Sequence, residues 1–314
     1  MATLTLQGSM VALVTPFRHD AIDEAALTRL VELHATSGTS AIVPCGTTGE
    51  SATLSFEEHE RVIELTVQAA RGRLPVIAGT GSNNTREAIR LTAHAKQAGA
   101  DAALLISPYY NRPTQQGLYL HFKAIAEAVD LPLVLYNIQS RTGVNIEPET
   151  FARLAQIRTI IGVKEASGSL EQMGRILQMT DGRLALLSGD DALTLPVLSI
   201  GGTGVISVAA NLVPRDVAAM VDAFRAGRHE EALEWHRRLA PLIKALFLET
   251  NPIPVKTAMG LLGMIEPELR LPLCAMSEAN EQRLRQALGG YGLLGAGACP
   301  GTGSMFPRSD RLET

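Results

Sequence analysis

The stretch Ile160–Ser167, IIGVKEAS, is a short and nearly continuous apolar run that carries one lysine, Lys164. Seven similar runs occur along the chain, beginning at Ser9, Ala41, Pro75, Ala102, Pro132, Leu184 and Gly204. Runs that are apolar without alternation are typical of parallel strands buried on both faces. The segment around Lys164 is therefore expected to be one strand of a parallel sheet.

Longer amphipathic stretches separate these runs and are expected to form helices. One of them, residues 84–99, opens with Asn84 as a predicted N-cap and stops at Gly99. Eight strand–helix units in strict alternation imply a parallel sheet. In a chain of 314 residues, eight units favour a closed (β/α)8 TIM barrel over an open doubly wound sheet, and no G-x-G-x-x-G follows the first strand.

The same pattern predicts how the chain is divided. Residues 1–227 are expected to form the barrel as a catalytic domain. Three further amphipathic stretches predict a small C-terminal helical appendage over 228–293. The segment 294–314 is rich in glycine and proline and has no period, so a mobile tail is expected there.

Composition argues against several classes of protein. A net charge of -4 and a pI near 6.0 give no reason to expect a nucleic acid or an anionic membrane as partner. The three cysteines, Cys45, Cys274 and Cys299, are too few and too far apart to indicate a disulfide framework or a metal site. No signal peptide is recognisable, and no apolar run reaches the roughly 20 residues of a membrane span, so a cytoplasmic location is expected.

In a (β/α)8 barrel the active site forms at the carboxyl ends of the strands. The polar groups expected there are the Gly46-Thr47-Thr48-Gly49-Glu50 loop, Tyr109, Tyr110, Tyr136, Arg141, Lys164 and the Ser188-Gly189-Asp190-Asp191 turn. No histidine falls at these strand ends, and no Asp/Glu/His group has the spacing of metal ligands. We therefore expect an amine nucleophile and no metal.

Lys164 stands out because only five of the 28 basic residues are lysines. Burial in an apolar strand disfavours the ammonium form and lowers the pKa, to about 7–8 in catalytic lysines. A neutral amine can attack a keto group and form an imine. The alternative is a buried lysine paired with Glu165, but adjacent residues of a strand point to opposite faces, which makes that pair geometrically poor.

The tyrosines each have a structural alternative to a catalytic role. Tyr136, at the end of its strand, could shuttle protons during imine formation, or it could be a core tyrosine with a satisfied hydroxyl. Tyr110 follows Tyr109 in a loop with two prolines. Two aromatic side chains at a loop tip usually pack, often across an interface, so a catalytic role for Tyr110 does not follow from its position.

The glycine-threonine loop and Arg141 have similar alternatives. Thr47 and Thr48 could hold a carboxylate, with Glu50 opposing a larger anion such as a phosphate, or they could cap a glycine turn. Arg141 could clamp a second carboxylate with two hydrogen bonds, or it could remain solvated.

Eight ordered motifs carry a resemblance to a known family: GTTGESATL, PVIAGTGSN, SPYYNRPTQQGL, YNIQSRTG, GVKEASG, LLSGDDALTL, GVISVAAN and NPIPVK. Together they resemble the dihydrodipicolinate synthase (4-hydroxy-tetrahydrodipicolinate synthase) family, from about Gly8 to Leu294. The resemblance implies a lyase of the class I pyruvate aldolase superfamily. Its reaction would join pyruvate to L-aspartate 4-semialdehyde in diaminopimelate and lysine biosynthesis, with no cofactor beyond a covalent imine to Lys164.

The resemblance also implies a proton relay and an assembly. The relay would consist of Thr47, Tyr110 and Tyr136, with Tyr110 reaching into the site of the neighbouring subunit. The family implies a homotetramer, a dimer of tight dimers.

Four further residues are implied to bind substrate. Thr48 would help to hold the pyruvate carboxylate, and Arg141 would bind that of the semialdehyde. Gly189 and Ile206 would line the pyruvate pocket through main-chain groups. One departure affects the second substrate: Gln139 stands where the family commonly has proline, which would stiffen the loop that carries Arg141.

An allosteric site for L-lysine is implied by a set of residues of matching type: Ser51, Ala52, His59, Asn83, Glu87 and Tyr109. Glu87 could hold the amino group and Asn83 the carboxylate. Phe56 stands where some sensitive enzymes have histidine, so a moderate sensitivity to lysine is expected.

Two alternatives differ from this interpretation. The first is a related pyruvate-dependent aldolase, such as N-acetylneuraminate lyase or a keto-sugar-acid aldolase, which would share Lys164, Tyr136 and the GTTGE loop. Arg141 together with the Tyr110 loop favours the semialdehyde over these substrates. The second is a catalytically silent regulator on the same scaffold, against which the intact lysine, tyrosines and threonine argue.

Overall fold

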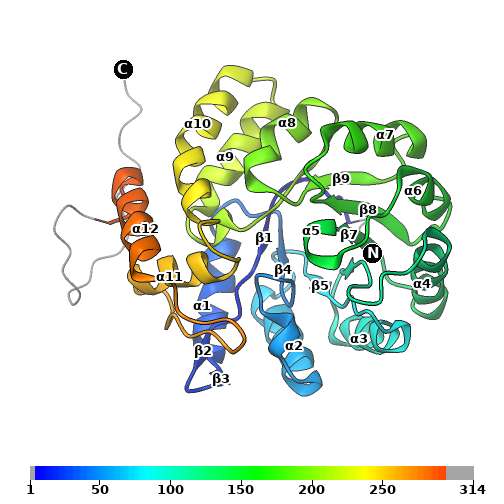
Figure 1. The fold of residues 1–314 in the computed structure, drawn as a ribbon, viewed down its shortest axis with the longest axis horizontal. Coiled ribbons are helices and arrows are strands. Elements are labelled where there is room, and N and C mark those ends of the chain that lie inside the picture. The colour runs from blue at the N-terminus through cyan, green and yellow to red at the C-terminus, as the bar shows by residue number, and fades with distance from the viewer. Residues whose placement is uncertain (1–3, 295–314) are drawn as a thin grey trace.

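A closed ring of eight parallel strands forms the centre of the molecule. The computed structural model describes residues 4–294. The strands lie in the order β4-β1-β10-β9-β8-β7-β6-β5. A parallel bridge between Ile42 and Val76 joins the two outermost strands, supported by a 2.9 Å hydrogen bond from the Ile42 amide to the Pro75 carbonyl. Helices surround this ring (Figure 1), so the predicted TIM barrel is confirmed.

Each predicted apolar run contains one strand of the ring. The strands are β1 (Gly8–Ala12), β4 (Ala41–Val43), β5 (Ile77–Gly79), β6 (Ala102–Ile106), β7 (Leu133–Asn137), β8 (Ile160–Glu165), β9 (Ala185–Ser188) and β10 (Gly204–Ser207). A short antiparallel hairpin, β2 (Phe17–Arg18) and β3 (Ala21–Ile22), follows β1. The hairpin was not predicted because strands of two residues leave no period in the sequence.

The helices follow the strands as expected. They are α1 (Glu24–Ala35), α2 (Phe56–Ala70), α3 (Thr85–Ala98), α4 (Gln115–Ala128), α5 (Gln139–Thr142), α6 (Pro148–Leu154), α7 (Leu170–Thr180), α8 (Thr194–Ser199), α9 (Pro214–Arg225), α10 (His229–Ala245), α11 (Ile253–Leu261) and α12 (Glu278–Tyr291). Asn84 caps α3 by accepting from the Arg86 amide, and Gly99 ends it with a φ of 92°. Both predicted boundaries of this helix are confirmed.

The hydrophobic core has two layers because successive side chains of each strand point to opposite faces. Met10 and Ala12 of β1 belong to the cluster inside the ring, together with Tyr136, Leu187 and Ile206. Val11, between them in sequence, belongs instead to a cluster between the strands and the outer helices. The barrel interior is therefore a packed core, with functional groups confined to its ends.

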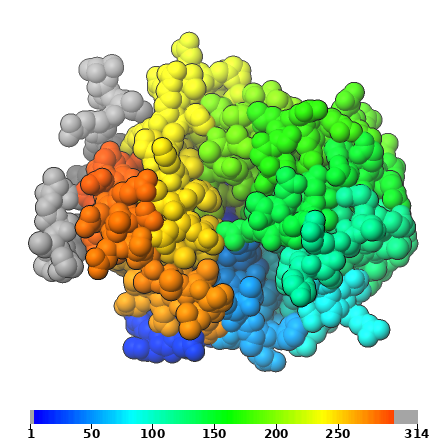
Figure 2. Space-filling view, in the orientation of Figure 1, coloured from blue at the N-terminus to red at the C-terminus, as the bar shows by residue number. Residues whose placement is uncertain are grey.

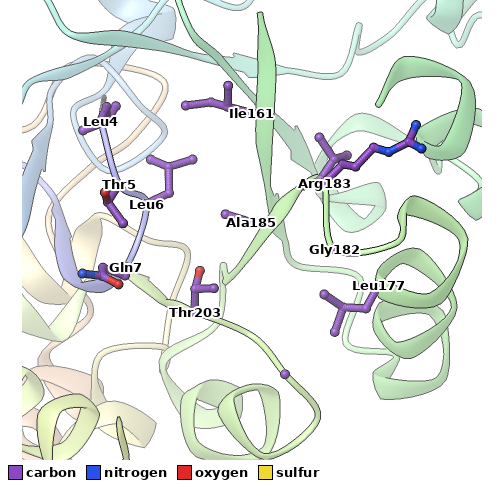
Figure 3. A pocket seen from close by; sticks show the side chains of 12 residues that line it. Leu4, Thr5, Leu6, Gln7, Ile161, Leu177, Gly182, Arg183, Ala185 and Thr203 are labelled. Carbon is purple, nitrogen blue, oxygen red and sulfur yellow. The ribbon is translucent and has the colours of Figure 1, made fainter. Parts of the chain in front are cut away.

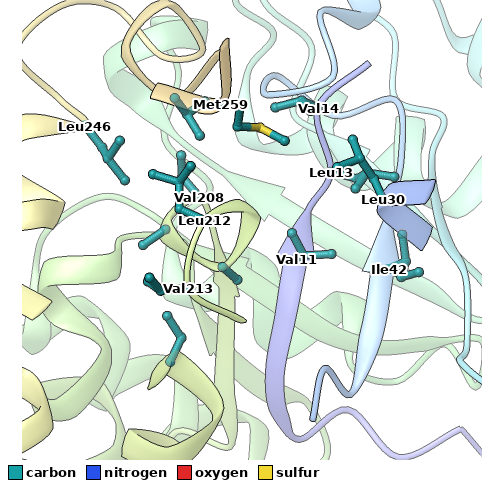
Figure 4. Close-up of a cluster of buried hydrophobic side chains, with 14 of the residues drawn as sticks. Val11, Leu13, Val14, Leu30, Ile42, Val208, Leu212, Val213, Leu246 and Met259 are labelled. Carbon is teal, nitrogen blue, oxygen red and sulfur yellow. The ribbon is translucent and has the colours of Figure 1, made fainter. Parts of the chain in front are cut away.

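The C-terminal helices pack onto one side of the barrel. In Figure 4, Leu246 and Met259 from this part of the chain lie in the same cluster as Val11 and Leu30. The space-filling view shows these segments, yellow to orange, beside the blue N-terminal ones (Figure 2).

The helical appendage is thus present, while its separation from the barrel as a domain at residue 227 stays a prediction. The tail predicted from residue 294 lies, from residue 295 on, outside the described residues.

Candidate active site

Lys164 lies near the carboxyl end of β8, beside Tyr136 of β7 and Leu187 of β9 in the sheet register. Its side chain is buried, with Nζ 4.3 Å from the centroid of the Tyr136 ring. Burial lowers the pKa of Lys164 to about 8; the Asp191 carboxylate opposes this shift, and the Arg141 guanidinium adds to it. The residue thus combines the position and the pKa that an amine nucleophile needs.

Glu165, the next residue, points away from Lys164. Its carboxylate accepts hydrogen bonds from Asn137 Nδ2 at 3.0 Å, the Ser167 amide at 2.7 Å and Gln172 Nε2 at 3.3 Å. These partners lie on the outer side of β8, toward α7. The proposed alternative of a Lys164–Glu165 pair is therefore wrong, for the reason of strand geometry given above.

Tyr136 and Thr47 are brought together with Lys164. Tyr136 is buried, and burial raises the pKa of its phenol to about 12 although Arg141 and a hydrogen bond with Thr47 act in the opposite direction. Thr47 comes from the loop after β4, three strands before β7 along the chain. The phenol of Tyr136 therefore lies beside both the amine of Lys164 and the hydroxyl of Thr47.

Thr48 and Arg141 are connected through Asn251, which precedes α11. Asn251 Nδ2 donates to Thr48 Oγ1 at 3.0 Å, and Arg141 Nη2 donates to the Asn251 carbonyl at 3.0 Å. Thr48 and Asn251 are buried, whereas Arg141 is exposed in the short helix α5. Asn251 was not singled out in the sequence, although it lies in the NPIPVK motif.

Gly189 lies next to Lys164, whereas Ile206 lies two strands away in β10. A Cβ atom at Gly189 would come within 2.7 Å of the Ala166 Cβ and 3.2 Å of the Lys164 Cγ, so any side chain there would crowd the lysine. Ile206 is buried inside the barrel in the cluster that also holds Tyr136 and Leu187.

Asp191 follows the end of β9 and belongs to the site, although the sequence predicted no role for it. Its buried carboxylate accepts from the Val208 amide at 2.9 Å, the Ala209 amide at 3.2 Å and the Ser207 hydroxyl. Burial raises the pKa of Asp191, and these hydrogen bonds oppose the shift. Its charge favours the ammonium form of Lys164. The only signal in the sequence was an aspartate pair after an apolar strand.

A buried ion pair holds the GTTGE loop through its last residue, Glu50. Glu50 Oε1 lies 2.5 Å from Lys256 Nζ of α11, and both side chains are fully buried. Lys256 Nζ also donates to the Thr15 carbonyl at 2.9 Å. The prediction that Glu50 would oppose a large anion at the mouth is wrong, because its charge is neutralised by Lys256 on the far side of the loop. Lys164 forms no such pair within residues 4–294.

Tyr110 is not brought into the site of its own chain. It is 91% exposed and lies in the left-handed region with a φ of 71°. Such a conformation is uncommon for a bulky residue. Its neighbour Tyr109 is partly exposed, and its carbonyl accepts from Asn83 Nδ2 at 3.2 Å.

The residues implied for a lysine site occupy four segments. Ser51 and Ala52 lie in a short 3-10 helix after the GTTGE loop. Glu87, in the first turn of α3, accepts from Ser82 Oγ at 2.8 Å, and burial lowers the pKa of His59 in α2 to about 4. Asn83 and Tyr109 touch, as described above. Of this set, Asn83, Glu87 and Tyr109 lie near the amino end of α3.

A cavity of about 340 Å³ lies at the opposite end of the barrel. It is lined near the first residues of β1, β8, β9 and β10 by Leu4–Gln7, Ile161, Gly182–Ala185 and Thr203 (Figure 3). It is remote from Lys164 at the carboxyl end of β8, and this end of a barrel supports stability rather than chemistry.

Residues 4–294 hold no cluster of three or more His, Cys, Asp or Glu side chains suited to a metal ion. Nor does this part of the chain include a helix of the length and apolar character that crossing a membrane requires.

Fold and site together define the class of protein: a lyase-type enzyme of the class I aldolase superfamily. The model of the Dihydrodipicolinate synthetase family matches residues 5–290, and the chain belongs to that family. Its membership sets aside the catalytically silent regulator considered above.

Individual relatives are similar in sequence to this chain along nearly its whole length. The 4-hydroxy-tetrahydrodipicolinate synthase of Syntrophus aciditrophicus is 57% identical over 289 residues, which is 92% of this chain and 99% of the relative. The chloride-inhibited dihydrodipicolinate synthase of Acinetobacter baumannii, solved with pyruvate, is 47% identical with a TM-score of 0.91, covering 92% of this chain and all of that one. The enzyme of Cyanidioschyzon merolae, solved with lysine bound, is 46% identical with a TM-score of 0.89, covering 92% and 99%.

Proposed function

We propose that this chain is a 4-hydroxy-tetrahydrodipicolinate synthase that condenses pyruvate with L-aspartate 4-semialdehyde through an imine on Lys164. The observation that carries the proposal is a buried lysine of lowered pKa, without an ion-pair partner among residues 4–294, in contact with a buried tyrosine. The 57% identity to a synthase of this activity supports the choice of substrates. No metal or organic cofactor is needed for this chemistry.

The first half of the reaction is the formation of the imine. The neutral amine of Lys164 attacks the keto carbon of pyruvate, and the oxygen leaves as water after taking up two protons. In this proposal Tyr136, with Thr47 beside its phenol, carries these protons. The protonated imine then loses a methyl proton and becomes a neutral enamine, as the electron pair of the broken C–H bond forms the C=C bond and that of the C=N bond moves onto the nitrogen.

The second half forms the carbon–carbon bond and frees the enzyme. The enamine carbon attacks the aldehyde carbon of the semialdehyde, and the aldehyde oxygen takes up a proton. The substrate amine then adds to the imine carbon and displaces Lys164, closing the ring. Arg141 at the entrance supplies a guanidinium for the carboxylate of this substrate.

Two experiments test the proposal in sequence. Borohydride reduction in the presence of pyruvate, followed by peptide mass spectrometry, should show a pyruvate-derived adduct on Lys164. Turnover with pyruvate and aspartate semialdehyde should then exceed cleavage of N-acetylneuraminate by orders of magnitude. An unmodified Lys164 would exclude the imine mechanism, and the opposite substrate preference would leave the related aldolase as the function.

Gln139 precedes Arg141, the residue proposed to bind the carboxylate of the second substrate, and replaces a proline that is common in the family. It is the first residue of α5, where an amide hydrogen has no partner inside the helix. Proline at this position would lose no hydrogen bond, so glutamine and proline support the same backbone. The substitution therefore changes the stiffness of the segment before Arg141 rather than its path, which supports the semialdehyde as substrate.

The exposure of Tyr110 supports an assembly in which this side chain is covered. A partner subunit that received Tyr110 would bury a large aromatic side chain and add a second phenol to its own site. This arrangement agrees with the homotetramer, a dimer of tight dimers, expected from the family. Sedimentation or mass photometry at assay concentrations tests the assembly.

L-Lysine is the second proposed ligand, as a feedback inhibitor. The specific observation in favour is that Asn83, Glu87 and Tyr109 lie together near the amino end of α3, and a relative of 46% identity has been solved with lysine bound. Titration of L-lysine into the steady-state assay should give partial inhibition. No inhibition at millimolar lysine would remove this part of the proposal.

A further inference from the structure

Asn251 connects two residues that come from distant parts of the chain. It precedes α11 and is 6% exposed. Its side chain donates to Thr48 Oγ1 and its carbonyl accepts from Arg141 Nη2, each at 3.0 Å. One residue of the C-terminal part therefore contacts both groups to which carboxylate binding is assigned above.

The direction of the first hydrogen bond has a chemical consequence. A hydroxyl group has a single proton and can accept as well as donate, whereas an amide N–H can only donate. Because Thr48 Oγ1 accepts from Asn251, its own proton is left for another acceptor. Among the described residues, Thr48 Oγ1 donates to no protein group.

We propose that Asn251 is a positioning residue for the first substrate, which directs the Thr48 hydroxyl proton toward the pyruvate carboxylate while its carbonyl holds Arg141 at the entrance. The inference rests on the proposed function, because it assigns that carboxylate to Thr48. Asn251 acts through Thr48 and touches neither the keto carbon nor the amine. Its effect therefore falls on pyruvate binding and not on the chemical steps.

Two substitutions distinguish positioning from a merely structural role. Asn251→Ala removes the donor and should raise the pyruvate concentration for half-maximal adduct formation about tenfold, the effect of weakening one hydrogen bond to a charged group. Asn251→Asp keeps the shape but accepts the Thr48 proton and adds a negative charge, so the concentration should rise further. If shape alone mattered, the aspartate variant would be the milder one, and that order would overturn the proposal.

A double-mutant cycle tests whether the effect passes through Thr48. Thr48→Val keeps the size of the side chain and removes the hydroxyl. In this background Asn251→Ala should change pyruvate binding by less than about twofold, since the group it acts on is gone. Equal losses in both backgrounds would contradict the proposal. In the single Asn251→Ala variant, kcat and the KM for the semialdehyde should stay within about twofold of wild type, because the backbone carbonyl that holds Arg141 remains.

Adduct formation with pyruvate alone is the readout, so the second substrate does not enter the comparison. Absence of any adduct in the wild-type enzyme would reject the proposed function itself. Normal wild-type adduct formation with unchanged pyruvate dependence in both Asn251 variants would reject only the role of Asn251. Melting temperatures establish that each variant is folded, and the isosteric aspartate variant provides the test if the alanine variant is not.

Discussion

The Nζ atom of Lys164 lies 4.3 Å from the centroid of the Tyr136 ring, and the two residues are direct neighbours in the register of β7 and β8. The contact places the amine against an aromatic face in a buried environment, where water cannot solvate an ammonium group. The electrostatic state of this amine determines when the enzyme can begin its reaction.

The rate of imine formation should rise with pH through about 8. Lys164 has its pKa lowered to about 8, so the reactive neutral amine is the minority form below this pH and the majority form above it. The initial rate of adduct formation with pyruvate, quenched with borohydride at each pH, measures this directly. A midpoint near the ordinary lysine value of 10.5 would contradict the assignment, and Lys164→Ala reports the background from the other lysines.

Asp191→Asn should move that midpoint to lower pH. The Asp191 carboxylate favours the ammonium form, so removing its charge makes deprotonation easier. An asparagine can accept from the Val208 and Ala209 amides and donate to Ser207, which retains the local hydrogen bonds. The same pH series measures the shift. An unchanged or higher midpoint would show that Asp191 does not act on Lys164 by charge.

Tyr136→Phe should reduce kcat by about 100-fold to 10,000-fold, the usual effect of removing a general acid–base. The packing against Lys164 is kept because the ring remains, so slow adduct formation with pyruvate should persist. Tyr119→Phe in α4 removes a phenol outside the site and serves as the matched control. Equal activity of the Tyr136→Phe and wild-type enzymes would exclude the phenol from proton transfer.

Tyr110→Phe and Lys164→Ala should complement each other when co-expressed. If Tyr110 acts in the site of a partner, a mixed dimer contains one site with both residues intact. Random pairing then restores about a quarter of wild-type activity, because half of the dimers are mixed and half of their sites are intact. Each variant alone should be nearly inactive. Absence of complementation in verified mixed oligomers would place Tyr110 outside the partner's site.

Lys256→Met should destabilise the protein by about 3–5 kcal/mol, because it leaves the Glu50 carboxylate buried without its counter-charge. Urea unfolding measures the loss, and adding Glu50→Gln should recover part of it. The control is Arg158→Met, which breaks an exposed pair with Asp130 and should change stability by less than about 1 kcal/mol. If the two substitutions lowered the free energy of unfolding equally, burial of the Glu50–Lys256 pair would not contribute to stability.

Strand positions, side-chain orientation and helix ends could be predicted because they depend on nearby residues of the sequence. Contacts that form only when the barrel closes could not. The strand around Lys164 and the opposite orientation of Glu165 follow from the two-residue repeat, and the ends of α3 follow from Asn84 and Gly99. The ion pair between Glu50 and Lys256 joins residues 206 positions apart, so no local pattern reveals it.

The same limit applies within the site. Asp191 and Asn251 are ordinary polar residues in their own segments, and they gain a role only when β9, β10 and the segment before α11 meet at the mouth. The exposure of Tyr110 depends on the three-dimensional structure of the chain and not on its local sequence. The motif that contains it gives its residue type but not the direction in which it points.

The buried Glu50–Lys256 pair also implies an order of events while the chain is synthesised and folds. During synthesis the amino end of a chain emerges and folds first, so the GTTGE loop leaves the ribosome some two hundred residues before the lysine that neutralises it. Until residue 256 has emerged, Glu50 has no buried counter-ion and favours contact with water over its final place behind the loop. The contact that holds the threonine loop from the side of α11 can therefore form only in the last part of synthesis.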